Sequence, residues 1–515
     1  MVRLIRSCAG VALLVGLLVG CDWVTNASHA CTYGASDPVM SGTGRFVVFS
    51  AVCVTDPVAG GPLDGTGVGP LGLSVTQLFV RDLRTDVTTG VTYATGGGPS
   101  TNTAIHPVVS DDGRFVVFES PATDLVPGDT NGVTDVFARD VVAGTTVRLS
   151  ETSTGVQGNG HSYEPAIAAD GSTVSFVSRS SNLVPNGPAG GGIYVENVLT
   201  RVISLPVQVG GTTSSMSGGI SADGVHLLVS RYAQFGAQIG IFVRDLGTGT
   251  ESSRVDVNRT GGPPNGESDH AAISADGRYV AWETTAGDVV SGDASSSLDV
   301  FVRDVQTGTT RRVSAPITGQ VNGRSALDPR LSRTGRFVAF WATAPSGTSE
   351  PSQCYIADLA AGTVDVASAT GDGTPADSLC NQLSLSGDGR YLAFASAAKN
   401  LDDNDDGVAD IYVRFVVRPI VTSATPSSIP RGATTTVTLH GSGFATGTTV
   451  AFSGPGITVG PVTIVDARTL TVGLTVASGA ATGSRDVTPT NPGTGPGPNR
   501  GSVGRACSGC LTVAT

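Results

Sequence analysis

Seven polar residues recur at one fixed place in a repeated phrase of the sequence. Each stands seven residues before a glycine that opens a segment such as GRFVVFS, GRYVAWE or GRYLAFA. This polar column consists of Asp37, His106, Glu164, Ser217, His270, Asp328 and Gln382. Imidazoles and carboxylates bind metal ions and transfer protons. A shared position for so many of them makes the polar column a candidate site.

A second candidate is an acidic loop near the end of the repeated region. The segment DDNDDGVAD places Asp402, Asn404, Asp406 and Asp410 in a D-x-N-x-D-G-x-x-D pattern. A glycine inside such a loop permits the sharp turn that lets hard oxygen ligands converge on Ca²⁺. We expect calcium as the one cofactor, with an acidic solvated turn as the alternative. A thinner version of the pattern is Asp129, Asn131 and Asp135.

The cysteines suit an oxidising compartment. Pairing by neighbours predicts three disulfides, Cys31 with Cys53, Cys354 with Cys380, and Cys507 with Cys510. The last pair lies in CSGC, which also fits a thioredoxin-type redox motif. That motif needs a helix N-terminus to stabilise the thiolate, whereas CLTVAT predicts a strand, so a structural disulfide is favoured.

The elements that must position the polar column are short strands. The repeat glycines are Gly44, Gly113, Gly171, Gly224, Gly277, Gly335 and Gly389, which define seven units. Each unit predicts four strands, with an Asp-Gly-type turn after the first and a phrase such as VFARD or IYVEN as the third. High Gly and Pro content with 14% charged residues likewise favours an all-β protein.

Phrases such as DLVPGDTNGVTDVFARD and SADGRYVAW resemble the TolB-like, WD-repeat-like β-propeller family over residues 36–417. The resemblance implies blades stacked around an axis; we expect seven of them, with six, as in well-known members, as the alternative. The seventh unit has no fourth strand of its own. We expect residues 22–35, an N-terminal tether, to supply it and close the ring.

In a propeller the first strand of each blade is innermost. The polar column is then expected to surround one mouth of the central channel. The residues three positions later are expected to pack between blades; they are Met40, Val109, Ile167, Ile220, Ile273, Leu331 and Leu385. Two interpretations of the polar column stay open. It lines a water-filled channel, or it holds a cation or a small polar ligand, chiefly through His106, Glu164 and His270.

Residues 418–515 differ in character from the repeats. The segment RPIVTSATPSSIPRGATTTVTLHGSGF resembles the opening of IPT/TIG immunoglobulin-like domains. The resemblance implies a small β-sandwich after the propeller.

Residues 1–21 are expected to be a signal peptide. Arg3 and Arg6 precede an apolar run, and LVGC resembles a bacterial lipobox that ends at Cys21. The resemblance implies cleavage before Cys21 and lipidation of its thiol, hence an exported, membrane-anchored bacterial lipoprotein at the cell surface or in the periplasm. Contact with the membrane is expected through the lipid anchor only.

Two classes of function fit these features. The first is a lipid-anchored envelope protein that binds or scaffolds a protein or glycan partner. The alternative is an exported propeller enzyme that acts on glycans or peptides with acidic and histidine groups at the channel mouth. No H-E-x-x-H, G-x-S-x-G or Walker pattern occurs, which favours the binding protein. The net charge of -12 argues against nucleic acid as a partner.

Overall fold

The computed structural model describes most of the chain. The described residues are 24–26, 35–51, 75–85, 87–209, 215–233, 238–293, 297–315, 324–344, 347–370, 374–401, 408–415, 419–444, 447–466, 468–490 and 507–515. The chain forms two compact units: the first comprises Thr25–Ala369 and Pro375–Val413, and the second consists chiefly of Arg414–Thr515. Every element with described bounds is a β-strand.

Seven antiparallel sheets, numbered here in chain order, make up the first unit within the described residues. Sheet 1 consists of β2 (Ala35–Met40), β3 (Phe46–Ala51), β4 (Gln77–Asp82) and β5 (Val87–Gly90). Sheet 2 consists of β6 (Ile105–Val109), β7 (Phe115–Ser120), β8 (Asp135–Asp140) and β9 (Thr145–Arg148). Sheet 3 consists of β10 (Ser162–Ile167), β11 (Thr173–Ser178), β12 (Gly192–Asn197) and β13 (Ile203–Gln208). Sheets 4 and 5 consist of β14 (Ser215–Ile220), β15 (His226–Tyr232) and β16 (Gln238–Asp245); and β17 (Ser268–Ile273), β18 (Tyr279–Thr284), β19 (Asp299–Asp304) and β20 (Thr309–Arg312). Sheets 6 and 7 consist of β21 (Ala326–Leu331), β22 (Phe337–Ala342), β23 (Gln353–Asp358) and β24 (Thr363–Val366); and β25 (Cys380–Leu385), β26 (Tyr391–Ser396), β27 (Asp410–Phe415) and β1 (Val24–Asn26).

Two of these sheets depart from a simple repeat. In sheet 7 the strand beside β27 is β1, which comes from the other end of the chain. In sheet 4 only three strands are described, and the predicted fourth strand is reduced to an isolated bridge between Arg244 and Glu251.

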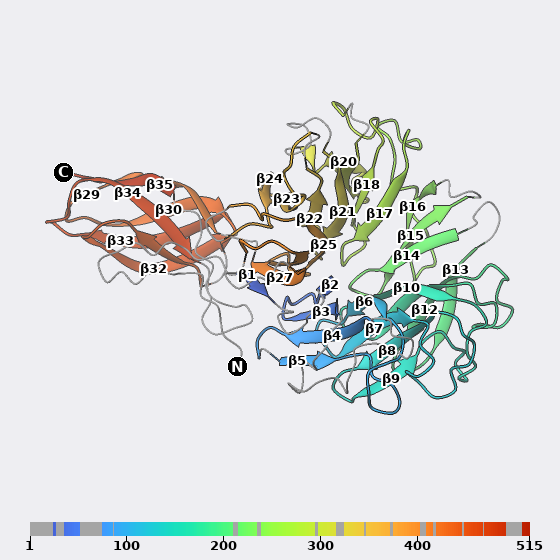
Figure 1. Cartoon of the computed structure of the whole chain (residues 1–515). Helices are drawn as coiled ribbons and strands as arrows, with labels where there is room; N and C mark the ends of the chain where they lie inside the picture. The colour runs from blue at the N-terminus through green and yellow to red at the C-terminus, as the bar shows by residue number, and fades with distance from the viewer. Residues whose placement is uncertain are drawn as a thin grey trace. The chain divides into compact units, whose positions relative to one another are not determined.

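The first strands of the seven sheets contact one another in a closed cycle, in the order β2, β6, β10, β14, β17, β21, β25 and back to β2. Figure 1 shows these strands at the middle of the first unit, with fourth strands such as β5, β9, β13 and β20 at its rim. A single sheet cannot bury both of its faces, and radial stacking solves this problem. The unit is a β-propeller.

The repeated phrase specifies both a turn and a contact between sheets. The repeat glycines all have positive φ, which glycine adopts without steric cost. A Cβ atom at Gly113 would overlap the Phe46 ring of the preceding sheet, and one at Gly44 would overlap Tyr391 of sheet 7. The residue before the glycine shapes the turn, because Asp112 Oδ1 accepts the backbone N–H of Arg114 at 2.9 Å. Asp170, Asp223, Asp276 and Asp388 accept the equivalent N–H.

The hydrophobic cores lie between sheets rather than within them. One buried cluster joins Val48 and Leu78 of sheet 1 to Val109 and Phe118 of sheet 2. The disulfide between Cys354 on β23 and Cys380 on β25 also joins two neighbouring sheets, and both cysteines are fully buried. It matches one of the expected pairings, whereas Cys31 and Cys53 lie outside the described residues.

The second unit contains two four-stranded sheets that share one core. The first consists of β28 (Ile420–Thr425), β30 (Thr434–Ser442), β33 (Thr469–Val476) and β32 (Ile457–Asp466), and the second of β29 (Ser428–Pro430), β35 (Cys507–Ala514), β34 (Gly483–Thr490) and β31 (Thr449–Phe452). Their buried residues, such as Val437, Leu474 and Val487, form a single cluster. The predicted disulfide between Cys507 and Cys510 is present and lies within a strand, β35, rather than at a helix N-terminus.

Candidate functional site

The polar column has an unusual backbone conformation. Within the described residues eight non-glycine residues have positive φ, and six of them belong to the polar column, which leaves out only Ser217. Their φ values run from 46° for His270 to 55° for Asp328. At each of the six, the first strand shifts register against the second, as a β-bulge does. Bulges re-aim side chains, and here they do so at the same place in six sheets.

Sheets 2 and 3 are joined by a buried glutamate. His106 Nδ1 lies 2.7 Å from Glu119 Oε1, and the backbone N–H of Glu164 donates to Glu119 Oε2 at 2.8 Å. The Glu119 side chain is 6% exposed, whereas that of His106 is 63% exposed. The glutamate therefore fixes the imidazole through Nδ1, and Nε2 stays accessible.

Sheets 5 and 6 repeat this network. His270 Nδ1 lies 2.9 Å from Glu283 Oε1, and the backbone N–H of Asp328 donates to Glu283 Oε2 at 2.5 Å. An additional cation completes this copy, because Arg330 Nη1 lies 2.8 Å from Asp328 Oδ1. The copy in sheets 2 and 3 has Ala166 at the position that corresponds to Arg330.

Sheets 7 and 1 meet through an amide. Gln382 Nε2 donates to Asp37 Oδ1 at 2.9 Å, and the Asp37 backbone N–H donates to Gln382 Oε1 at 3.2 Å. Ser217 differs from the other six residues, because β14 and β15 pair in continuous register there. The structure thus links the polar column residues in the pairs 7–1, 2–3 and 5–6.

The pKa values of three column residues are raised. The hydrogen bond to Glu283 raises the pKa of His270 to about 9, and the hydrogen bond to Glu119 raises the pKa of His106 above its ordinary value. Burial raises the pKa of Glu164 to about 7; the carboxylates of Glu119 and Asp269 also raise it, whereas the Gly218 N–H and the charge of His106 lower it. The His270 imidazole is therefore cationic at neutral pH, the cationic form of His106 is favoured by Glu119, and Glu164 titrates near neutrality.

An ion pair joins the turns that follow the first strands of sheets 2 and 6. Arg333 of sheet 6 bonds Asp111 of sheet 2, and the Asp111 carboxylate also accepts the Gly42 N–H at 3.0 Å. A Cβ atom at Gly42 or Gly387 would overlap the Arg333 side chain, so these glycines of sheets 1 and 7 make room for it. Arg333 lies in the turn that follows β21, five residues beyond Asp328 in the sequence.

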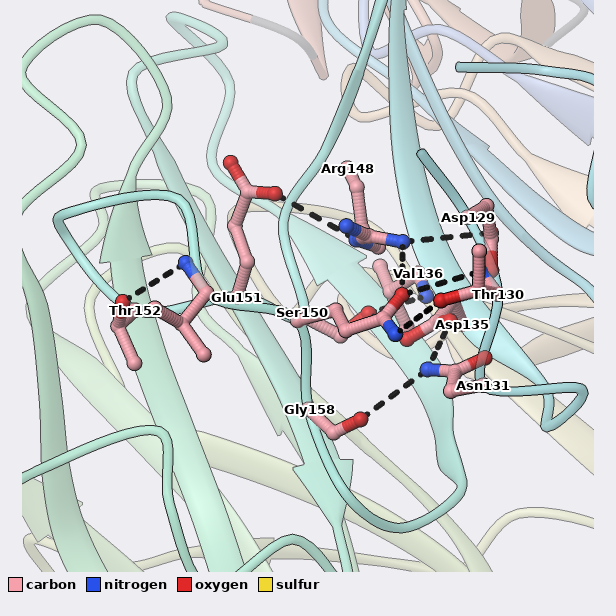
Figure 2. Close-up of polar contacts among 12 residues, drawn as sticks. Asp129, Thr130, Asn131, Asp135, Val136, Arg148, Ser150, Glu151, Thr152 and Gly158 are labelled. Carbon is pink, nitrogen blue, oxygen red and sulfur yellow. Dashed lines mark hydrogen bonds and ion pairs between the residues drawn. The ribbon is translucent and has the colours of Figure 1, made fainter. Parts of the chain in front are cut away.

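An arginine occupies the acidic loop of sheet 2, where the thinner calcium pattern was expected (Figure 2). Arg148 Nη1 lies 3.4 Å from Asp129 Oδ2, and Asn131 Nδ2 donates to Asp135 Oδ2 at 2.9 Å. Ser150 Oγ donates to the other oxygen of Asp135. Arg148 is 5% exposed, so a buried guanidinium supplies the positive charge that these carboxylates need. The expectation of calcium in this loop is therefore not supported.

In sheet 5 an arginine is paired with two buried carboxylates in the same way. Arg312 Nη1 lies 3.2 Å from Asp293 Oδ1, and Arg312 Nη2 lies 2.7 Å from Asp299 Oδ2. Of the main calcium candidates in sheet 7, Asp402, Asn404 and Asp406 lie outside the described residues, and Asp410 is buried at the start of β27. In the part of the chain that the structure describes, no three His, Cys, Asp or Glu side chains are grouped closely enough to hold a metal ion.

Sequence reasoning missed Glu119, Glu283 and Arg330. A signal for the two glutamates exists, since each stands thirteen residues after a column histidine. The five other units have no acid at that position. The residues there are Ser50, Val177, Ser230, Trp341 and Ala395.

No protein-family model matches the chain, and no curated protein sequence matches it. Solved structures with a similar fold include a prolyl endopeptidase, with a TM-score of 0.47 and 12% identity over 80% of this chain and 55% of that chain. They also include a WD40-repeat domain (TM-score 0.40, 8% identity, 76% of this chain, 97% of that chain) and a xyloglucanase from Xanthomonas campestris (0.42, 11%, 82%, 59%). The chain spans about half the length of the prolyl endopeptidase. These neighbours include enzymes and proteins built of WD40 repeats.

Among the described residues, no helix has the length and apolar character needed to cross a bilayer.

Proposed function

We propose that the chain is a lipid-anchored cell-envelope protein that binds a protein or glycan ligand at the polar column of a seven-bladed, TolB-like propeller. In this proposal β1 closes the ring as the fourth strand of the last blade. The C-terminal unit is an IPT/TIG immunoglobulin-like domain that serves as a spacer or second contact surface. Cys21 carries the lipid.

One observation carries the proposal. Six non-glycine residues of the polar column adopt the left-handed conformation, at a cost of about 1 kcal/mol each. Glycine would remove this cost, and the chain uses glycine freely, with 70 in total. Instead these positions hold Asp37, His106, Glu164, His270, Asp328 and Gln382. Side chains kept at a backbone cost favour a role in binding over a role in folding.

The experiment uses glycine for the same reason. A His106→Gly, His270→Gly variant removes both imidazoles and leaves a residue that suits the backbone. Elemental analysis and screening of small polar ligands, glycans and peptides are expected to give a signal with the native protein that is lost in this variant. An unchanged signal would leave only a water-filled channel.

The paired carboxylates and imidazoles favour a second candidate, an exported propeller enzyme. A buried carboxylate that orients a histidine, as Glu119 orients His106, is also found in general acid–base catalysis. Incubation with mixed glycans and peptides distinguishes the two functions. Turnover that depends on His106 would favour the enzyme, and binding without turnover would favour the scaffold.

The lipid anchor has its own test. The native protein is expected to partition into membranes, and a Cys21→Ala variant is expected to appear in the soluble fraction. Mass spectrometry of the mature N-terminus checks lipidation directly, and an unmodified Cys21 would contradict the anchor.

We also propose Ca²⁺ at the loop of Asp402, Asn404, Asp406 and Asp410. The support is the D-x-N-x-D-G-x-x-D spacing, which suits the oxygen ligands that Ca²⁺ takes in proteins. Calorimetry that shows no calcium uptake at millimolar concentration would refute this site.

A further inference from the structure

The two copies of the histidine–glutamate network differ in the partner of the polar column carboxylate. In sheets 5 and 6 the polar column carboxylate of Asp328 is paired with Arg330, which also donates from Nε to the Leu383 carbonyl oxygen at 3.3 Å. In sheets 2 and 3 the equivalent carboxylate is that of Glu164, and the residue in the place of Arg330 is Ala166. The histidine–glutamate pair and the backbone N–H donated to the glutamate are the same in both copies, whereas Asp269, which precedes His270, has Ile105 as its counterpart before His106.

The matching position of Ala166 and Arg330 follows from the strand pairing. Ala166 pairs with Ser175 directly after the bulge of sheet 3, and Arg330 pairs with Ala339 directly after the bulge of sheet 6. Each residue stands two positions after the polar column carboxylate of its strand. An arginine at either position therefore starts from the same place relative to the carboxylate.

No described cation of sheet 3 compensates Glu164. The charge of His106 in sheet 2 lowers the pKa of Glu164, but Nδ1 of His106 is hydrogen-bonded to Glu119, as Nδ1 of His270 is to Glu283. Burial and the negative charges of Glu119 and Asp269 outweigh His106, so that the pKa of Glu164 is raised.

We propose that Glu164 binds an organic cation, a guanidinium or primary ammonium group supplied by the ligand, in the place that Arg330 takes beside Asp328. This inference rests on the proposed function, because it names the chemistry that the polar column recognises. The Asp328–Arg330 pair of sheet 6 shows how a guanidinium group would lie in such a site. Such a cation comes either from a small amine or from an Arg or Lys side chain of a protein partner.

The direct test places an arginine of the chain itself beside Glu164. In Ala166→Arg the chain supplies its own guanidinium to Glu164, as sheet 6 does for Asp328. Calorimetry on the detergent-solubilised full chain would use two probes, agmatine for a small amine and the capped peptide acetyl-Gly-Arg-Gly-amide for a side chain. We expect the native protein to bind at least one of them, and Ala166→Arg and Glu164→Gln to lose at least tenfold in affinity. Binding of agmatine alone indicates a small amine, and binding of the peptide indicates a partner side chain.

A matched control variant and a second measurement distinguish a specific loss of binding from a general effect of added charge. Ala272→Arg adds the same charge at the corresponding position of sheet 5, beside His270, and is expected to stay within about threefold of the native affinity. Because the pKa of Glu164 is about 7, cation binding at pH 7 should release about half a proton, measured in buffers of different ionisation enthalpy. Ala166→Arg should show no release.

Two results would overturn the inference. One is native affinity in Ala166→Arg, and the other is no binding of either probe to the native protein at millimolar concentration. A ligand that needs His106 and His270 but is insensitive to Glu164→Gln would refute this inference and leave the proposed function standing.

Discussion

The backbone strain of the polar column can be measured at Gln382. Its side chain is exposed and hydrogen-bonds with Asp37, so Gln382→Ala and Gln382→Gly remove the same interactions. With φ at 48°, alanine keeps the left-handed strain and glycine relieves it. Left-handed strain costs about 1–2 kcal/mol, and the greater freedom of glycine in the unfolded chain offsets about 0.5–1 kcal/mol. We expect Gln382→Gly to be more stable than Gln382→Ala by about 1 kcal/mol.

Ser217 provides the opposite case, because its strand pairs without a bulge. There Ser217→Gly should be less stable than Ser217→Ala, by about 0.5–1 kcal/mol. Urea unfolding of the four variants at one pH measures both differences. The same sign at both positions would refute the claim that strain is stored at the bulges, and with it the main support for a binding role.

Three further predictions concern charge and covalent links. The folded pKa of His270, about 9, exceeds its unfolded value, so the stability that its pair with Glu283 contributes should be complete below pH 6.5 and lost as the pH rises toward 9; Glu283→Gln should abolish this slope in urea midpoints. Arg148→Met should cost about 3 kcal/mol because it leaves the buried Asp129 carboxylate without its ion pair, whereas Arg114→Met, which removes an exposed pair with Asp140, should cost much less in the same assay. Replacement of Cys354 and Cys380 by serine should lower the free energy of unfolding by about 3 kcal/mol, and no change in the thermal midpoint would contradict a stabilising role.

The repeat glycine made much of the fold predictable. Glycine with positive φ and the Asp that precedes it define a turn from local chemistry alone, so the first two strands of every sheet follow from the sequence. The fourth strand of sheet 4 was not predictable in the same way. The segment after Gly249 has the right composition, but a strand forms through pairing with its neighbour, which local sequence does not specify.

The site was predictable in position but not in conformation. Asp37, His106, Glu164 and Asp328 each precede a proline, a context that ordinarily favours extended backbone, yet their φ values are 49° to 55°. The prolines themselves carried the missing signal, since a residue without an N–H fits a sheet at a bulge. The pairing of Arg148 with Asp129 was not predictable, because the two residues are distant in sequence and come together only when β8 and β9 pair.

The most direct test of the central claim compares the native protein with His106→Gly, His270→Gly as immobilised baits for envelope proteins and glycans. Glycine fits the left-handed backbone at both positions, which offsets part of the stability lost with the two histidine–glutamate pairs, and the comparison is made below the unfolding temperature of the variant. The account predicts a component that the native protein retains and the folded variant loses by at least tenfold. Equal capture by the two proteins would contradict a ligand site at the polar column.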